Sequence, residues 1–297
     1  MWRVFVSVSM ALVISIIGSA QVKKQFFIES NNSFQKLDLT FSTKSGMCYI
    51  KPSQHNIPLS IYSNQDFDDY EHSFNKEVNN NTCFVDLSLT DKGSDNLSRS
   101  ISYQMFSSKE KEGDKMWKLY LSQDTPYRLN FNYGIGDAFI DLSGLSIENL
   151  KVYSGNADVN IDYASLLGNQ VQMDTFFVKV DLGSVDVRKM NLAHAKTVLA
   201  DVGFGNLSLD YTEIPEVDSY VKASVGAGNL IVKIPADDVP VKVKIHDSML
   251  CKVRLSENFK EVEGGTYVNK AYSENAKNLL SFNVDVALGS IVFQEVK

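Results

Sequence analysis

The sequence predicts an all-β protein, a single-stack β-solenoid of parallel rungs with an N-terminal β region. A small-residue motif of the Gly-Xaa-Gly type, or a close variant of it, recurs six times after residue 130. Apolar and polar residues alternate on both sides of each motif, as half-buried strands require. Helical periodicity is scarce, so we expect at most a short helix at 145–150 or 272–280.

The first element, residues 1–20, is typical of a secretory signal peptide. Arg3 precedes the apolar run 4–17, and the small residues 18–20 form a cleavage site before Gln21. The alternative is an uncleaved anchor, but the run is short for a bilayer span of about 20 residues. We therefore predict an exported chain without a transmembrane segment after cleavage, located in the periplasm, on the outer surface or in the medium.

The second element, residues 21–120, is a less regular N-terminal β region. The segment 34–52 contains one strand-corner-strand unit around Gly46, and the segments 55–63 and 82–90 alternate like further strands. An open solenoid end exposes strand edges that must be capped or paired. We expect this region to form the cap of the stack or its first rungs.

The third element, residues 121–297, is the repeat solenoid, with an insertion or loop around 257–278. Aligned on the second small residue, the corners are 21, 26, 22, 23 and 61 residues apart, by subtraction of their positions. The first four spacings suit one rung each. The glycines that we predict as structural corners are Gly134, Gly136, Gly155, Gly183, Gly203, Gly205, Gly226, Gly228 and Gly289.

At each corner the apolar pattern changes parity, which predicts a bend that keeps both arms facing one interior. Glycine would supply the unusual backbone angles of such a bend, and a neighbouring Asn or Asp would hydrogen-bond its own backbone. The predicted core residues that flank the bend are three apart. They are Leu182 with Val185, Phe204 with Leu207, and Ala227 with Leu230.

The corners "GNLSLDY" and "GAGNLIVKIP" resemble the toast-rack, or adhesin-like, domains of bacterial exported and envelope-stress proteins. The most specific match is "GAGNLIVKIPADDVPVKVKI", and the resemblance is close from about 120 to 297 and loose from 21 to 120. Asn156 and the Leu-Gly-Ser corners at 182–184 and 288–290 depart from the pattern. The resemblance implies stacked parallel β rungs and transfers no catalytic residue.

Several kinds of chemistry lack their motif. The residues after the glycines alternate like a strand, with no third glycine and no helix, so a dinucleotide fingerprint is excluded. No GxSxG elbow occurs, the four histidines are far apart, and the three cysteines form no zinc motif. We expect no cofactor, and the net charge of −7 argues against nucleic acid as the partner.

Two sets of side chains are weak site candidates. Stacked rungs would align Asp137, Asp141, Asp158 and Asp162, which could bind Ca²⁺, although polar outward positions near turns are often Asp without function. Outward tyrosines could stack on sugars, although most are expected in the core or over an edge. These tyrosines are Tyr153, Tyr163, Tyr211 and Tyr220.

The sequence thus favours an exported non-enzymatic scaffold, or an adhesin-like binding protein of the bacterial envelope, whose partner is an envelope protein or a glycan. Two alternatives remain open. One is a β-helix carbohydrate-active enzyme that uses paired aspartates such as Asp158 and Asp162. The other is an accessory subunit of an envelope-stress response, which the resemblance permits.

Overall fold

The computed structural model describes residues 23–92, 115–211, 213–235, 239–247 and 249–296, so the predicted signal peptide lies outside the described residues. The described chain is β throughout, apart from turns and the short 3-10 helix η2 (Met190–Ala193), which confirms the predicted fold class. The strands are β1 (Lys23–Ile28), β2 (Lys36–Ser53), β3 (Leu59–Ser63), β4 (Tyr70–Asn79), β5 (Thr82–Asp91), β6 (Met116–Ser122), β7 (Pro126–Asp141), β8 (Ser146–Asp162), β9 (Met173–Val180), β10 (Ser184–Val187), β11 (Ala195–Val202), β12 (Asn206–Asp210), β13 (Ser219–Val225), β14 (Asn229–Pro235), β15 (Val241–Asp247), β16 (Lys252–Arg254), β17 (Lys260–Glu263), β18 (Thr266–Val268), β19 (Leu280–Val286) and β20 (Ser290–Val296).

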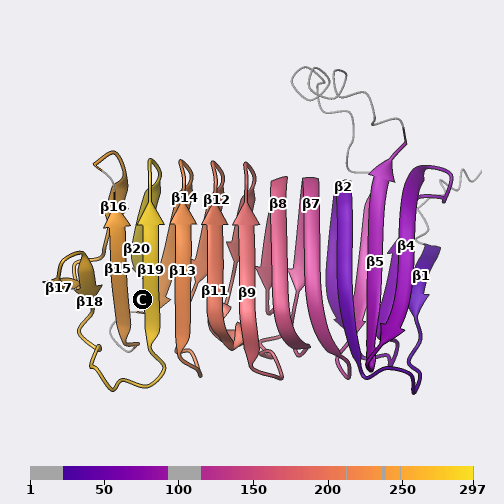
Figure 1. Ribbon diagram of the computed structural model, residues 1–297, viewed down its shortest axis with the longest axis horizontal. Helices are drawn as coiled ribbons and strands as arrows, with labels where there is room; N and C mark the ends of the chain where they lie inside the picture. Colours follow the sequence, from indigo (N-terminus) through magenta and orange to yellow (C-terminus); the bar gives the residue numbers. More distant parts are fainter. Residues whose placement is uncertain (1–22, 93–114, 212, 236–238, 248, 297) are drawn as a thin grey trace, which may run out of the picture.

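Each rung consists of two arms joined at a corner. In the later rungs the first arm is β9, β11 or β13, and the second arm is β10, β12 or β14. Equivalent arms pair in parallel from rung to rung, so the first arms form one wall and the second arms form another. The long strands β2, β7 and β8 run through the corner and supply both arms. Figure 1 shows the rungs side by side along one axis.

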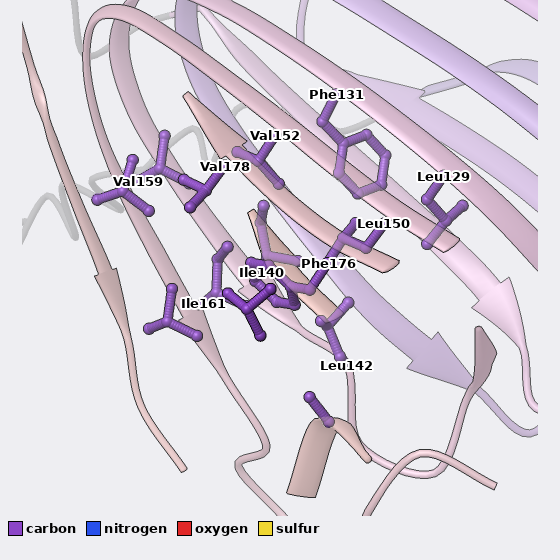
Figure 2. Packing of buried hydrophobic residues seen from close by; sticks show 14 of the residues in the cluster. Leu129, Phe131, Ile140, Leu142, Leu150, Val152, Val159, Ile161, Phe176 and Val178 are labelled. Atoms are coloured by element: carbon purple, nitrogen blue, oxygen red, sulfur yellow. The ribbon is translucent and has the colours of Figure 1, made fainter. Parts of the chain in front are cut away.

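The core is the apolar layer between the two walls. Val152 and Val178 point inward from the first wall, while Val159 and Ile161 point inward from the second (Figure 2). All four side chains are at most 1% exposed. Because side chains alternate along each strand, the opposite face of each wall is left to polar and aromatic residues.

At the N-terminal end, β2 lies inside the stack. Its first arm pairs with β5 and β7, and its second arm pairs with β6 and β7, all in parallel. The antiparallel strands β4 on the first wall and β3 followed by β1 on the second complete this end. The strands β1 to β6 therefore continue the same two walls that the later rungs build.

At the C-terminal end, the order of the rungs departs from the order of the sequence. β19 pairs with β13 on one side and β15 on the other, and β20 lies between β14 and β16. The strands β19 and β20, which follow all the other strands in sequence, thus form an internal rung (Figure 1). The rung β15–β16 and the hairpin β17–β18 precede it in sequence, which explains the long spacing between Gly228 and Gly289.

The corners differ from the sequence prediction in one respect. The buried residues that flank a corner are five apart, for example Val180 with Val185 and Val202 with Leu207. Leu182 and Phe204, predicted in the core, are 62% and 73% exposed, and Ala227 is also exposed. The separation is still odd, so both arms face the interior, but three residues form the turn and the middle one points to solvent.

The predicted short helices are wrong. Residues 146–162 form the continuous strand β8, and 272–279 form turns and irregular chain before β19. Asn169 makes the difference at the first site, since its side chain bonds the backbone of Ile147 in both directions, at 2.8 and 2.7 Å. This amide holds the start of β8 extended, a contact over 22 residues that local sequence does not reveal.

Candidate binding surface

All nine glycines named from the sequence lie at or beside the corners. A Cβ atom at Gly183, Gly205 or Gly228 would lie 2.1 to 2.3 Å from the carbonyl oxygen of the preceding rung. Only Gly46 and Gly136 have positive φ among the corner glycines, at 109° and 117°. Close stacking of backbone on backbone therefore accounts for the glycines of the later corners. At Gly136 it acts together with the unusual backbone angle, since a Cβ atom there would lie 2.2 Å from the Gly46 carbonyl oxygen.

At three later corners, the polar residue after the corner glycine bonds to the equivalent residue of a neighbouring rung. The Asn229 side-chain amide donates to Asn206 Oδ1 at 2.8 Å, and the Ser290 hydroxyl donates to Asn229 Oδ1 at 2.5 Å. These positions are one above the other in the parallel register of β12, β14 and β20. They form a ladder of side-chain hydrogen bonds on the outer surface that ties neighbouring corners together.

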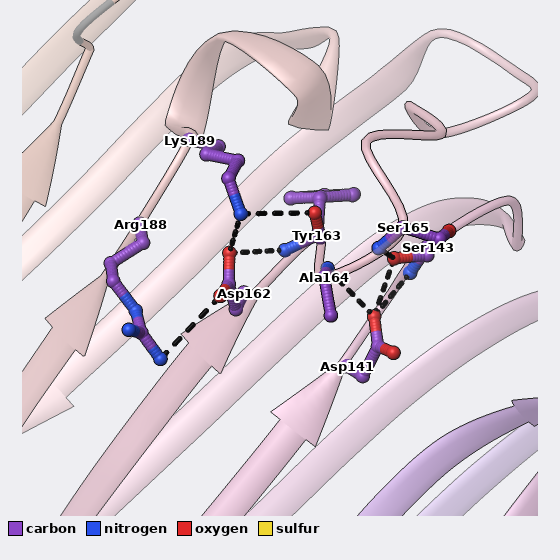
Figure 3. Close-up of polar contacts among 8 residues, drawn as sticks. All are labelled: Asp141, Ser143, Asp162, Tyr163, Ala164, Ser165, Arg188 and Lys189. Carbon is purple, nitrogen blue, oxygen red and sulfur yellow. Dashed lines mark hydrogen bonds and ion pairs between the residues drawn. The ribbon is translucent and has the colours of Figure 1, made fainter.

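Asp141 and Asp162 face each other across β7 and β8, but each is bound by the protein itself (Figure 3). Asp141 accepts hydrogen bonds from the backbone N–H groups of Ser143 and Ala164, at 3.0 and 3.2 Å. Asp162 lies 2.7 Å from the Lys189 ammonium and 3.4 Å from the Arg188 guanidinium. The protein's own cations and N–H groups thus neutralise this row.

Asp137 and Asp158 are also register partners on β7 and β8, and both side chains are exposed. Within the described ranges, no group of three or more His, Cys, Asp or Glu side chains is arranged to hold a metal ion. Calcium binding by the four aspartates, and catalysis by Asp158 with Asp162, stay predictions.

The four histidines lie in separate places. The His194 ring contacts the carbonyl oxygen of Asn169 at 2.8 Å, and His72 packs among aromatic rings near Phe26. His246 is exposed on β15, and His55 lines the groove described below.

The three cysteines are free thiols. Cys48 and Cys83 are fully buried on β2 and β5, and Cys251 is half-buried against the core. Burial raises the pKa of the Cys48 thiol, so this group stays protonated and packs as a small apolar side chain.

The tyrosines named as sugar-stacking candidates are distributed between core and surface. Tyr163 and Tyr211 are at most 1% exposed. Tyr153 is half-buried beside Phe177, with 5.2 Å between the ring centroids. Tyr220 is 43% exposed on the first wall and shares a 3.3 Å hydrogen bond with Asn283.

A different set of aromatic residues lines a hollow in the surface, which we call the tyrosine groove. It has a volume of about 550 Å³ and lies on the outer face of the second wall, at the N-terminal end of the stack. The strands β3 and β6 supply Ser60 and Tyr62, and Lys118 and Tyr120, respectively. The end of β2 and the link from β2 to β3 supply the rim, with Pro52, Ser53, Gln54, His55 and Ile57.

Tyrosine and lysine side chains alternate on this face, both along β2 and β6 and between neighbouring strands, and we call this arrangement the checkerboard. Lys118 lies in register between Tyr62 and Tyr49, and Tyr120 lies in register beside Lys51. Lys118 and Tyr120 also line a second hollow of about 180 Å³ with Tyr49 and Lys51, which extends the groove across β2. Among the described residues, neither lysine lies within ion-pair distance of a carboxylate.

The aromatic rings are held by one another. The centroids of Tyr62 and Tyr120 are 5.7 Å apart with the planes at 85°. Tyr49 stacks on Phe139 of β7, with 5.3 Å between the centroids and 17° between the planes. Such pairs restrict ring motion, so the surface is ordered before any ligand arrives.

The rim of the groove is anchored from inside the core. Tyr127, at the start of β7, is fully buried, and its hydroxyl lies 2.7 Å from the Pro58 carbonyl oxygen and 3.0 Å from that of Ser122. Burial raises the pKa of the Tyr127 hydroxyl, which therefore remains a donor at neutral pH. This contact fixes the chain where it enters β3.

The sequence analysis did not predict this site, although the alternating pattern of β6 can be read from the sequence. The segment "MWKLYLS" alternates strictly, which places Met116, Lys118 and Tyr120 on one face. What the sequence does not show is that β6 lies between β3 and β2, because these strands are far apart in the chain and one pairing is antiparallel.

The comparisons with known proteins concern the fold. The family model described as the N-terminal domain of toast_rack matches residues 16–184. No curated protein matches the chain. In the described residues, no helix is both long and apolar enough to cross a membrane.

Two crystal structures are similar in fold at low sequence identity. A "putative cell adhesion protein" from Clostridium sporogenes is 14% identical with a TM-score of 0.43, and the match covers 93% of this chain and 100% of that one. A "putative adhesin" from Bacteroides fragilis is 14% identical with a TM-score of 0.36, over 93% and 98% of the two chains. At these TM-scores the likenesses support no functional inference.

Proposed function

The chain belongs to the family of the N-terminal domain of toast_rack, and we propose that it is an exported, non-enzymatic scaffold that binds a component of the bacterial envelope in the manner of an adhesin. In this proposal the two walls are a rigid support, and the tyrosine groove is the contact surface. Localisation in the periplasm, on the outer surface or in the medium is part of the proposal.

The observation that carries the proposal is the preformed tyrosine groove on a wall that is hydrogen-bonded on both sides. β6 pairs with β3 and β2, and β3 pairs with β1, so the strands below the groove cannot shift independently. Rings that are already ordered lose little conformational entropy when a partner binds. Aromatic side chains are also the residues most enriched where binding energy is concentrated.

The proposal is tested by retention on the envelope of the producing bacterium. The purified protein is mixed with membrane, cell-wall and capsule fractions, and the bound amount is measured for wild type and for Tyr62→Ala/Tyr120→Ala. We expect one fraction to retain the wild type and the groove variant to lose most of that binding. Tyr153→Ala/Tyr220→Ala, on the outer face of the first wall, is the matched control and should bind like wild type.

The non-enzymatic part is checked on the same fraction. Its retained component should be recovered chemically unchanged after prolonged incubation with the protein. Release of shortened fragments, or equal binding by the groove variant and wild type, would contradict the proposed function.

A further inference from the structure

We propose that the tyrosine groove binds a polysaccharide that carries one carboxylate per sugar, a polyuronate, and this inference rests on the proposed binding function. The sugar rings lie against Tyr62 and Tyr120, and the carboxylates pair with Lys118 and Lys51. The argument uses the arrangement of the side chains, the charge of the groove and the closed backbone beneath it.

The checkerboard offers two chemistries at alternate positions. An aromatic ring presents a weakly negative face, which suits the apolar C–H face of a sugar ring. An ammonium group is a point charge that pairs with a carboxylate. Lys118 lies in register between Tyr62 and Tyr49, and Lys51 lies in register beside Tyr120, so each of these tyrosines has a lysine on a neighbouring strand.

The charge of the groove selects an anionic ligand of low charge density. Lys118 and Lys51 have no carboxylate partner among the described residues, although the whole chain has a net charge of −7. Asp141, on the neighbouring strand β7, already accepts hydrogen bonds from the backbone N–H groups of Ser143 and Ala164. Two lysines match one carboxylate per sugar, whereas a heavily sulfated chain or a nucleic acid needs a denser array of cations.

The backbone beneath the groove argues against a peptide strand as the occupant. Peptides that bind sheets commonly add a strand to a free edge. β6 and β3 each have neighbours on both sides, so the floor of the groove offers no free backbone groups. Recognition on these strands therefore goes through side chains, among which a polyuronate can use the tyrosine rings and the ammonium groups at once.

The test measures binding of a tetra-galacturonate to the purified protein by titration calorimetry at low and high salt. Its fully methyl-esterified form keeps the sugar shape and removes the charge. We expect the free acid to bind more weakly as salt rises and the ester to bind at least about tenfold more weakly, because a hydrogen bond to a charged group contributes about 1.5–3 kcal/mol.

Variants locate the binding site. Lys51→Met/Lys118→Met keeps the aliphatic stems and should lose affinity by about tenfold or more, and Tyr62→Ala/Tyr120→Ala should lose it as well. The matched control Tyr220→Ala/Lys222→Met removes the same residue types from the outer face of the first wall and should bind like wild type. Thermal unfolding of each variant confirms that it is folded, and the lysine variant serves if the tyrosine variant is not.

The outcomes separate the two proposals. Equal binding of acid and ester, preference for heparin over galacturonate, or unchanged binding by both groove variants overturns the polyuronate. If an envelope fraction retains the protein through the groove but tetra-galacturonate does not bind, the polyuronate is wrong and the proposed function stands. If no envelope fraction retains the protein, the proposed function itself fails.

Discussion

At the scale of single residues, the outer faces of the walls hold charges that serve the stack itself. Asp162 receives the Lys189 ammonium at 2.7 Å and the backbone N–H of Tyr163 at 2.8 Å, and its side chain is only 19% exposed. Asp158 lies four residues earlier on the same face of β8. Its side chain is exposed, and its carboxylate has no hydrogen bond or ion pair with the described residues. The two aspartates are alike in sequence and differ in environment.

This difference predicts unequal effects of the same substitution. Asp162→Asn should lower the free energy of unfolding by about 1–2 kcal/mol at pH 7, because charge-assisted bonds to Lys189 are lost. Asp158→Asn should change it by less than about 0.5 kcal/mol. Urea denaturation of both variants measures this, and equal losses would contradict the assignment of Asp162 to the stack.

Buried tyrosines predict a loss of stability at high pH. Burial raises the pKa values of Tyr127, Tyr133, Tyr163 and Tyr211 above the ordinary value of 10.0. Above pH 10 the unfolded chain releases these protons while the folded chain keeps them. Stability is therefore complete below about pH 10 and falls as the pH rises, by about 1.4 kcal/mol per pH unit for each tyrosine.

The measurement is the urea midpoint between pH 8 and 11. Tyr163→Phe is the matched variant, because the Tyr163 hydroxyl has no hydrogen-bond partner among the described residues. Its midpoint should fall less steeply with pH than that of wild type. A midpoint that does not fall above pH 10 would show that these hydroxyls are not buried as described.

At the scale of the element, the two glycines of a late corner differ in the space around them. The second glycine of each late corner lies against the backbone of the previous corner, while the first glycine has more room. A Cβ atom at Gly205 would lie 2.3 Å from the Gly183 carbonyl oxygen, whereas at Gly203 the nearest atom, the Asp181 carbonyl oxygen, is 3.1 Å away. Neither glycine has positive φ, so only the available space distinguishes them.

Two alanine substitutions in one corner test this reason. Gly205→Ala must push the rungs apart and should cost about 1–3 kcal/mol or more, as overpacking does. Gly203→Ala should be close to neutral, because a mild contact opposes the lower entropy of the unfolded chain. Thermal unfolding of both proteins gives the comparison, and equal destabilisation would mean that backbone freedom, and not stacking, determines the corner.

At the scale of the whole molecule, the C-terminal strands lock the stack. β19 and β20 lie between the rungs β13–β14 and β15–β16, although both of these rungs precede them in the sequence. β19 pairs over seven residues with β13 and over seven residues with β15. Phe282 and Phe293 meet inside this rung, with ring centroids 5.0 Å apart. Loss of this rung would remove the parallel partners of both β15 and β16.

Deletion of residues 279–297 should therefore abolish cooperative unfolding of the C-terminal half, unlike the removal of a terminal rung from an ordinary repeat protein. Removal of residues 23–28, which form the strand β1 at the edge of the described sheet, should leave a folded protein of lower stability. Circular dichroism melts and limited proteolysis distinguish the two. A C-terminal deletion that melts like wild type would refute the internal position of β19–β20.

The sequence by itself determined the fold class and the place of the corners. Alternation on both sides of a glycine is a local signal, because the side chains of a strand point to opposite faces with period two. The same signal failed at Leu182 and Phe204, where the turn is longer than one residue and apolar side chains point to solvent. An apolar residue therefore predicts a core position within a strand, but not in the turn between two strands.

Only the tertiary structure decided which strands are neighbours, and with them the tyrosine groove. β6 meets β3 and β2, and β19 inserts between β13 and β15, through pairings whose partners are tens of residues apart. Strand pairing is specified by hydrogen bonds between backbones that are chemically the same along the whole chain. The order of rungs therefore depends on how all side chains fill the shared core, which no single segment records.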